Sequence, residues 1–237
     1  MKQGEIIKEF LVPPHPKGIS IEGNLVNLKP LVANQFANEL FHSNAIDKDD
    51  INWAYLPYGP FENLEDYSKW IESFEVSNDP VFFAIISKKL KKAIGVASYL
   101  RINPSIGSIE VGHINFSPLL QRTTEATESM YLMMKWVFDN GYRRYEWKCN
   151  ALNIKSRNAA QRLGFSYEGV FRQMTIAKGR NRDTAWFAMI DKEWQSIERC
   201  FTEFLSESNF ELNGKPKISL SSLTQPILYK LDNLDLS

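Results

Sequence analysis

Three β-rich runs follow one another in the middle of the chain, and they constrain its fold more than any other feature. They are VFFAIISK (residues 81–88), KKAIGVASYLRI (91–102) and SIEVGHINFS (108–117), joined by the turn-forming stretches KKLKK and NPSIG. Short runs rich in β-branched and aromatic residues, separated by turn residues, are typical of antiparallel hairpins. We therefore expect a three-stranded antiparallel meander.

Helical spacing surrounds this meander. Apolar residues recur at helical intervals over 32–44, 62–77 and 124–140, whereas 24–31 alternates as a half-buried strand does. The third helix should end at Asn140, because a glycine follows it. A Met-rich stripe on this helix predicts a surface that faces the core.

A strand, a helix and a hairpin complete the pattern. We expect a strand over 143–150, a short helix over 153–165, a hairpin over 169–190 that turns at KGRNRD, and a helix over 191–208. A terminal strand over 226–231 is the last expected element. A strand, a helix and a strand in succession predict a βαβ unit whose two strands lie parallel. The chain therefore belongs to the mixed α and β class.

Length and composition indicate one large core with extensions. The chain has 237 residues, of which 43% are hydrophobic and 13% aromatic, enough for a sizeable core. The proline-rich stretch 11–20 is typical of an extended arm. We expect an N-terminal arm over 1–23, a folded domain over 24–194, and a C-terminal helix and extension over 195–237.

Charge and cysteine usage exclude several classes of partner. Lys and Arg together number 28, as do Asp and Glu, so no net field attracts a nucleic acid or an anionic membrane. The two cysteines have no metal-ligand spacing and suit a reducing compartment. No apolar run approaches the length of a membrane span, and the N-terminus is too polar for a signal peptide. We expect a cytoplasmic monomer or homodimer with no metal, no nucleic-acid partner and no membrane partner.

The junction after the third run of the meander is the most informative place for function. It reads SPLLQRTTEATESM (117–130) and opens the helix over 124–140. Where a strand splays from a parallel neighbour, the cleft lies beside the first turn of the next helix, whose amides attract diphosphate. The alternative is that Thr123 or Thr124 simply caps the helix, while Glu125 and Glu128 complement its dipole.

Several ordered segments resemble the GCN5-related N-acetyltransferases, and within them the branch similar to bacterial ribosomal-protein N-terminal acetyltransferases. QRTTEA (121–126) matches the cofactor loop Gln/Arg-x-x-Gly-x-Gly/Ala, except that Thr124 replaces the first glycine. NIKSRNAAQRLGF (153–165) resembles the second cofactor element. The segments WAYLPYGPF, EVGHINFSP, EWKCN and GRNRDTAWF also resemble members of the family. The resemblance covers about residues 24–194.

The resemblance implies a fold and a cofactor. The fold would be a central twisted, mostly antiparallel sheet of about seven strands with one splayed parallel pair, flanked by about four helices and a C-terminal helix. Acetyl-CoA would be the co-substrate, with backbone groups of β-strand residues along its pantetheine arm and helix-start amides at its diphosphate. The cofactor-binding residues carried over are Ile114, Asn115, Phe116, Gln121, Arg122, Thr123, Thr124, Glu125, Ala126, Asn153 and Ser156.

The implied reaction is direct acetyl transfer to an amine, such as a protein N-terminus or a small amine. The amine must lose a proton, and Glu110 and Glu146 are the candidate bases because each is a carboxylate in a central strand. We place Glu110 ahead, since the matching strand faces the acceptor cleft in the family. Ser156 is the candidate donor to the leaving thiolate, and the alternative is that it is only a first-turn residue of its helix. His113 is another candidate base, although a lone strand histidine is more often structural.

Strand alternation predicts which way these side chains point. It places Glu110 on the same face as Gly112, Ile114 and Phe116. It places Glu146 opposite its neighbours Tyr145 and Trp147. The alternative for each carboxylate is a structural ion pair with Arg143, Arg144 or Lys148.

The acceptor side rests on an aromatic loop. Tyr55 and Tyr58 are expected to line the substrate groove together with Glu146, beside Trp53 and Phe61. The alternative is that these rings form a satellite core. The basic turn 178–183 would approach the same region, or simply be a solvated turn. A competing function is a catalytically silent CoA-binding or protein-interaction module on the same fold.

Overall fold

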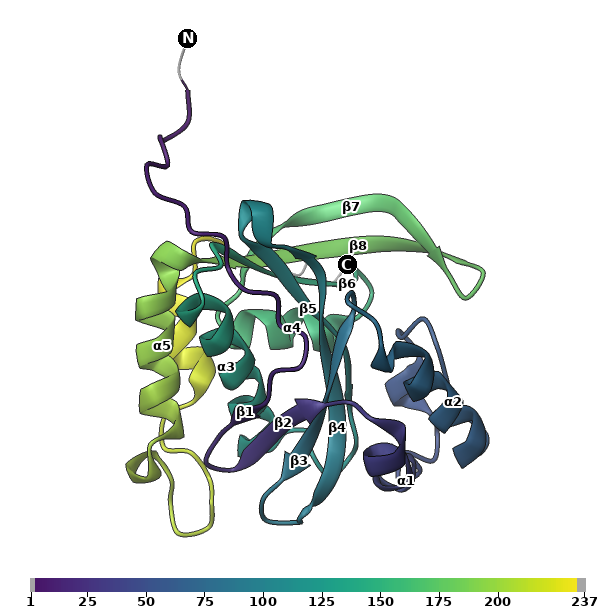
Figure 1. Cartoon of the computed structure of the whole chain (residues 1–237). Helices are drawn as coiled ribbons and strands as arrows, with labels where there is room; N and C mark the ends of the chain where they lie inside the picture. Colours follow the sequence, from purple (N-terminus) through teal and green to yellow (C-terminus); the bar gives the residue numbers. More distant parts are fainter. Residues whose placement is uncertain (1–2, 234–237) are drawn as a thin grey trace.

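One sheet of eight strands runs through the computed structural model, which describes residues 3–233 (Figure 1). The strand order is β1-β2-β3-β4-β5-β6-β8-β7. The strands are β1 (Ile21–Glu22), β2 (Val26–Pro30), β3 (Val81–Ser87), β4 (Lys92–Asn103), β5 (Ser108–Phe116), β6 (Arg144–Asn150), β7 (Ser166–Ala177) and β8 (Arg180–Ile190). The α-helices are α1 (Ala33–Asn44), α2 (Leu64–Glu75), α3 (Thr124–Asp139), α4 (Ile154–Arg162), α5 (Asp191–Leu205) and α6 (Leu220–Thr224). The mixed, mostly antiparallel fold expected from the sequence is confirmed.

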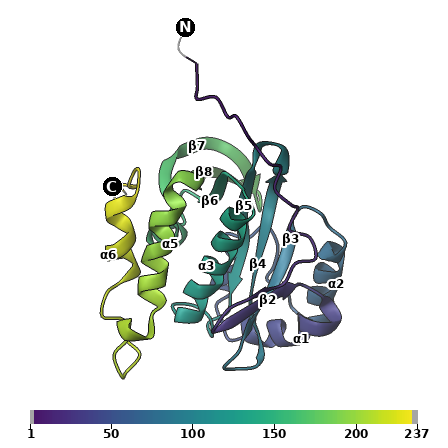
Figure 2. The same cartoon turned by 60° about the vertical axis from the view of Figure 1, so that its left-hand side comes forward.

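The helices cover the two faces of the sheet unequally. Helices α3 and α5 lie together on one face with α6 beyond them, and α1 and α2 lie on the other (Figure 2). Each face has its own apolar cluster. The larger one lies under α3, α4 and α5, and the smaller one lies between the sheet and the α1–α2 pair. Met130, Met133 and Met134 are buried in the larger cluster, so the Met-rich stripe of α3 is core.

Within residues 3–233 only one neighbouring pair of strands is parallel, and its two strands stop pairing after four residues. β5 and β6 pair from Ser108 with Arg144 to Val111 with Trp147. Beyond that point β5 continues to Phe116 and β6 to Asn150 without pairing to each other. Helix α3 connects the two strands, as a parallel crossover requires. The splayed pair is the feature of the fold that positions the site.

One expectation about topology is confirmed in strand direction only, and another is wrong. The strands β6 and β7, which α4 connects, do run in the same direction, but β8 lies between them and pairs antiparallel with both. The expected terminal strand over 226–231 is instead a 3-10 turn, Gln225–Ile227, followed by extended chain. One backbone hydrogen bond, from Tyr167 N to Lys230 O at 2.9 Å, ties that chain to β7. The count of about seven strands becomes eight with the two-residue β1.

Among the residues that the structure describes, no helix has the length and apolar character needed to cross a bilayer.

Candidate active site

The splay between β5 and β6 opens beside the first turn of α3. The preceding loop is folded by its own backbone, because the amides of Leu120 and Gln121 both donate to Ser117 O, at 2.9 and 3.1 Å. Arg122 adopts a left-handed conformation with φ of 61°. Thr123 then caps the helix, and its Oγ1 accepts a hydrogen bond from Ala126 N at 3.1 Å. The capping role expected for Thr123 or Thr124 therefore belongs to Thr123.

Three amides of this turn remain unpaired. Within residues 3–233, the backbone N–H groups of Arg122, Thr124 and Glu125 have no acceptor, whereas Ala126 N bonds to Thr123 Oγ1 and the amide after it bonds to Thr123 O. Unpaired amides at a helix start carry partial positive charge and bind anions. The Glu125 carboxylate is turned toward β3, where it accepts a hydrogen bond from Ser87 Oγ at 2.5 Å. The turn therefore presents donors to the cleft.

Gln121 and Asn52 close the end of β5. Both amide side chains donate to Phe116 O, at 2.7 Å from Gln121 Nε2 and 3.2 Å from Asn52 Nδ2. Gln121 also donates to Asn52 Oδ1 at 2.6 Å. The Phe116 carbonyl, expected to pair with a pantetheine arm, is therefore already occupied.

A bulge in β5 overturns the expected alternation of side chains. His113 has φ of 51°, and the register with β4 shifts between Gly112 and Asn115. As a result, Ile114 and Phe116 pack against the larger cluster under α3, on the face opposite Glu110. Asn115 is buried, and its Oδ1 has no hydrogen-bond partner in the described chain.

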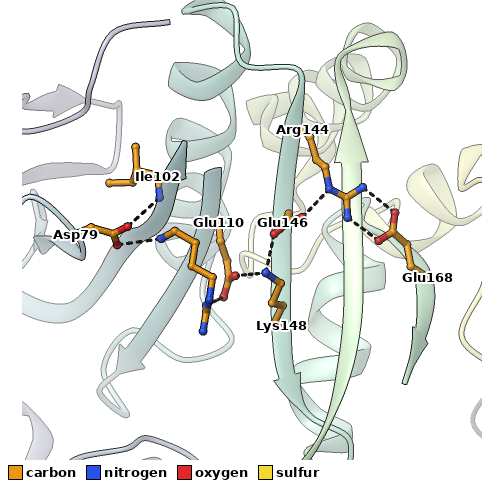
Figure 3. Close-up of polar contacts among 8 residues, drawn as sticks. Asp79, Ile102, Glu110, Arg144, Glu146, Lys148 and Glu168 are labelled. Atoms are coloured by element: carbon orange, nitrogen blue, oxygen red, sulfur yellow. Dashed lines mark hydrogen bonds and ion pairs between the residues drawn. The ribbon is translucent and has the colours of Figure 1, made fainter. Parts of the chain in front are cut away.

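Glu110 lies at the centre of a chain of charges that crosses β4, β5 and β6 (Figure 3). Its side chain is only 3% exposed, and it contacts Arg101 Nη1 at 2.6 Å and Lys148 Nζ at 2.8 Å. Asp79 helps to place Arg101, because its carboxylate accepts the backbone N–H groups of Arg101 and Ile102. Burial raises the pKa of Glu110, and the two cations oppose that rise only in part.

Glu146 continues the same chain of charges. It accepts from Lys148 Nζ at 2.7 Å and from Arg144 Nε at 2.6 Å, and Arg144 in turn binds Glu168. Burial raises the pKa of Glu146, but its hydrogen bonds from Lys148 and Arg144 outweigh this effect, so the pKa lies below its usual value. Glu146 thus has the ion pairs with Arg144 and Lys148 that were the alternative to a functional role.

His113 faces the smaller cluster and stays neutral. Its ring stacks on Tyr58 at a centroid distance of 5.5 Å and lies 5.1 Å from Phe82. Burial, with help from Arg101 and Arg182, lowers the pKa of His113 to about 4. A histidine with so low a pKa is a weak base at neutral pH.

The start of α4 lies on the other lip of the splay. Asn153 caps this helix, and its Oδ1 accepts from Ser156 N at 3.1 Å. The Ser156 hydroxyl accepts from Trp147 Nε1 at 3.0 Å. Because that contact uses a lone pair, the hydroxyl proton of Ser156 remains able to donate.

The aromatic loop between α1 and α2 is mostly core. Trp53, Tyr58 and Phe61 all belong to the smaller apolar cluster, as the satellite-core alternative states. Tyr55 is instead exposed and donates to Leu152 O at 3.2 Å, so it joins this loop to the loop before α4. Lys178, at the tip of the β7–β8 hairpin, donates to the carbonyls of Trp53 and Gly59. Loop, hairpin and splay therefore meet at one place.

Comparison with known proteins decides the family. Residues 26–166 match the family described as "Acetyltransferase (GNAT) domain". The chain belongs to the GNAT family of acetyltransferases. A GCN5-related N-acetyltransferase from Brucella melitensis shares 38% identity, with a TM-score of 0.90 over 92% of this chain and 100% of that one. No curated protein matches the chain.

Other GNAT structures share the fold. A probable GNAT acetyltransferase from Chromobacterium violaceum is 37% identical with a TM-score of 0.77, over 82% of this chain and 98% of that one. The Microcin C7 self immunity acetyltransferase MccE, solved with acetyl-CoA and AMP, is 22% identical with a TM-score of 0.63, over 71% of this chain and 93% of that one. The GNAT family uses acetyl-CoA as its acetyl donor. No group of three or more His, Cys, Asp or Glu side chains in residues 3–233 is arranged to hold a metal ion.

Sequence reasoning missed four contributors to this GNAT site. Arg101 was not singled out, and Arg182 was considered only as part of the basic turn 178–183, because each reaches the site through the register of a hairpin. Asn52 lies before the aromatic loop and has no motif of its own. Lys148 was considered only as an ion-pair partner of a carboxylate. Its spacing of two residues from Glu146 along β6 predicts that both side chains lie on one face of the sheet.

Proposed function

We propose that this chain is an N-acetyltransferase that transfers acetyl from acetyl-CoA to an amine. One observation carries the proposal: the unpaired edge of β5 runs from the unpaired amides of α3 toward the buried carboxylate of Glu110. A diphosphate binds at helix-start amides, and an extended pantetheine arm adds to an open strand edge. The same cleft then ends beside a carboxylate able to accept a proton.

The residues present fit the cofactor. The amides of Arg122, Thr124 and Glu125 supply three donors for a diphosphate, and the Glu125 carboxylate is held away from them by Ser87. The β5 edge remains open at Ile114, on the side where β6 has separated. Acetyl-CoA, when bound, supplies the acetyl group as a thioester.

Glu110 and Ser156 have separate roles in the transfer. The amine nitrogen bonds to the acetyl carbon while the carbon–sulfur bond breaks, so one proton leaves the nitrogen and one reaches the sulfur. Glu110 takes the proton from the amine, because burial raises its pKa toward the range of an effective base. Ser156 donates a hydrogen bond to the departing thiolate, which takes its proton from solvent, because Trp147 fixes the hydroxyl by binding only a lone pair. Tyr55 and Tyr58 border the acceptor, with Glu146 on the same sheet face as Glu110.

The experiment compares Glu110→Gln with the wild type. The assay measures the rate of thiol release from acetyl-CoA in the presence of a panel of small amines and peptides with free N-termini. We expect this rate to fall about 100-fold or more in Glu110→Gln, the usual contribution of a general base. CoA affinity by calorimetry should be unchanged, since the carboxylate lies away from the diphosphate turn. Glu168→Gln, at the far end of the same chain of charges, is the matched control and should retain activity.

A silent CoA-binding module is the second candidate, because two cations already pair with Glu110. A carboxylate so paired has less tendency to take a proton. Calorimetric binding of CoA without thiol release from any amine would establish the module. Absence of CoA binding would refute both candidates.

A further inference from the structure

Arg182 is a half-buried arginine that has no partner. Its Nε is buried and makes no hydrogen bond within the described residues, and no ion pair there includes it. Burial lowers the pKa of Arg182, and repulsion from Arg101 lowers it further. A desolvated guanidinium normally has an acceptor, because leaving the charge unpaired is costly. A buried polar atom that lacks a partner in the protein calls for an explanation, and a bound ion is one.

The sheet register places Arg182 on the face of Glu110. β8 pairs with β6 so that Trp186 lies opposite Lys148, and facing residues of an antiparallel pair point to the same side. Alternation along β8 then places Arg182 on that side too. Arg182 is also close to both Glu110 and His113 electrostatically. Its charge lowers the pKa of His113, and the charge of Glu110 raises the pKa of Arg182.

A second unpartnered donor lies on the same strand. Trp186 Nε1 is buried and has no acceptor in residues 3–233. Its ring is held in place by Lys148 Nζ, 3.8 Å from the centroid, and by Phe171, stacked at 4.5 Å. The indole N–H therefore has a fixed direction, so it is a preorganised donor.

The charges of this face leave one cation in excess. Arg101 and Lys148 are paired with Glu110, Lys148 and Arg144 are paired with Glu146, and Arg144 is also paired with Glu168, so three cations meet three carboxylates. Arg182 has no ion pair in the part of the chain that the structure describes. The missing partner of Arg182 is therefore an anion, and the indole N–H of Trp186 is a further donor on the same face.

We propose that the acceptor amine carries an anionic group, a carboxylate or a phosphate, which Arg182 and the Trp186 indole bind beside Glu110. This inference rests on the proposed N-acetyltransferase function and names the class of its acceptor. The anion fixes the acceptor at one end, and the carboxylate of Glu110 receives the proton from its amine at the other. Neutral amines lose that fixed point and are poorer substrates.

Matched acceptor pairs test the inference by turnover. The pairs are L-phenylalanine with its amide, O-phosphoethanolamine with ethanolamine, and short peptides with Asp or Asn as the second residue. We expect kcat/KM to favour the anionic member of at least one pair by about 10- to 100-fold, the usual effect of a charge-assisted hydrogen bond. The pair that shows the preference tells carboxylate from phosphate. Equal rates within every pair that reacts would overturn the inference.

Arg182→Met isolates the guanidinium. The variant should bring the ratio of kcat/KM within the preferred pair close to one, mainly by lowering the rate for the anionic member. A purely structural role would lower both rates together. Arg172→Met, which removes an exposed arginine from the neighbouring strand β7, is the control and should keep the wild-type ratio. A preference that survives in Arg182→Met would show that Arg182 does not bind the acceptor.

A binding measurement separates this inference from the proposed function. We expect the NMR signal of the Trp186 indole N–H to shift when inorganic phosphate or succinate is titrated into the wild-type protein, and to stay fixed in Arg182→Met. If no amine is acetylated but this shift occurs, the transferase proposal fails and the anion site stands. If amines are acetylated and no shift occurs with either anion, the anion site fails alone.

Discussion

Glu110 and His113 lie three residues apart on β5, and burial favours the neutral form of each. The pKa of the Glu110 carboxyl is raised, whereas the pKa of the His113 imidazole is lowered to about 4. The direction differs because the carboxyl is charged when deprotonated and the imidazole when protonated. These directions support the proposal that Glu110, and not His113, accepts the proton, while the His113 ring stacks on Tyr58.

His113 should make the fold sensitive to acid. Its folded pKa of about 4 lies below the ordinary value of 6.5, so its contribution to stability is complete above pH 6.5 and is lost as the pH falls toward 4. We expect His113→Phe, which keeps a ring against Tyr58, to reduce the loss of unfolding free energy between pH 7 and 4.5 by about 2–3 kcal/mol. Urea unfolding at the two pH values measures the difference, and identical losses in both proteins would contradict it.

Thr124 should crowd the diphosphate turn. It is the first residue of α3 and has helical geometry, so the backbone does not require the family's glycine at this position. The residue of this turn with a left-handed backbone, which would favour glycine, is Arg122. A helical Cβ points back toward the N-terminus, which is over the unpaired amides. We expect Thr124→Gly to bind CoA several-fold (~3-fold) more tightly by calorimetry, since the desolvated amides become more accessible. Thr124→Ser distinguishes crowding by the side chain from a contact of the hydroxyl with the phosphates. If CoA binds more weakly to Thr124→Gly but not to Thr124→Ser, the hydroxyl contacts the phosphates.

At the scale of elements, α3 holds the first strands through Glu128. Both carboxylate oxygens accept backbone amides from the β1–β2 connection: Asn24 N at 2.9 Å, Leu25 N at 2.7 Å and Val26 N at 2.8 Å. The sequence predicts that Glu128 complements the helix dipole. In the structure Glu128 also makes a contact with residues more than one hundred positions away in the chain.

Glu128→Gln should destabilise the fold, because an amide nitrogen replaces one acceptor and leaves at least one of these N–H groups unpaired. We expect a loss of about 2 kcal/mol in unfolding free energy, measured by urea denaturation. Glu65→Gln removes an exposed partner of Lys69 on α2 and should change stability by less than about 1 kcal/mol. Equal effects of the two substitutions would show that the Glu128 contacts contribute little.

The elements themselves were largely predictable, and their pairing was not. Local periodicity and stop signals predicted the meander, α3 and α4, since these depend on neighbours in sequence. The position of β8 between β6 and β7 depends on pairing between distant strands, which no local pattern encodes. The predicted side-chain direction of Ile114 and Phe116 was wrong for a local reason. A left-handed histidine is uncommon, so nothing in SIEVGHINFS indicates a bulge at His113.

At the scale of the whole molecule, the C-terminal extension packs back onto the cofactor side. Asp232 is buried, and its carboxylate binds Arg157 on α4 through two contacts of 2.7 Å. Arg157 also donates to Ala151 O at 2.8 Å, so it joins the extension to the loop that carries Asn153. The domain limits expected at 24–194 stay a prediction, but part of the chain beyond them supports the lip of the splay.

Breaking this pair should affect both stability and cofactor binding. In Asp232→Asn the Arg157 guanidinium loses its charged partner in a buried setting, where the Asp232 side chain is 1% exposed. We expect the unfolding free energy to fall by about 3 kcal/mol and the CoA affinity to fall a few-fold (~3-fold), because the loop before α4 is less firmly held. Glu5→Gln removes a pair with Lys192 in which the Glu5 and Lys192 side chains are 78% and 67% exposed. That control should change neither quantity, since exposed ion pairs contribute little. Wild-type CoA affinity in a clearly destabilised Asp232→Asn would show that the extension supports the fold without supporting the cofactor site.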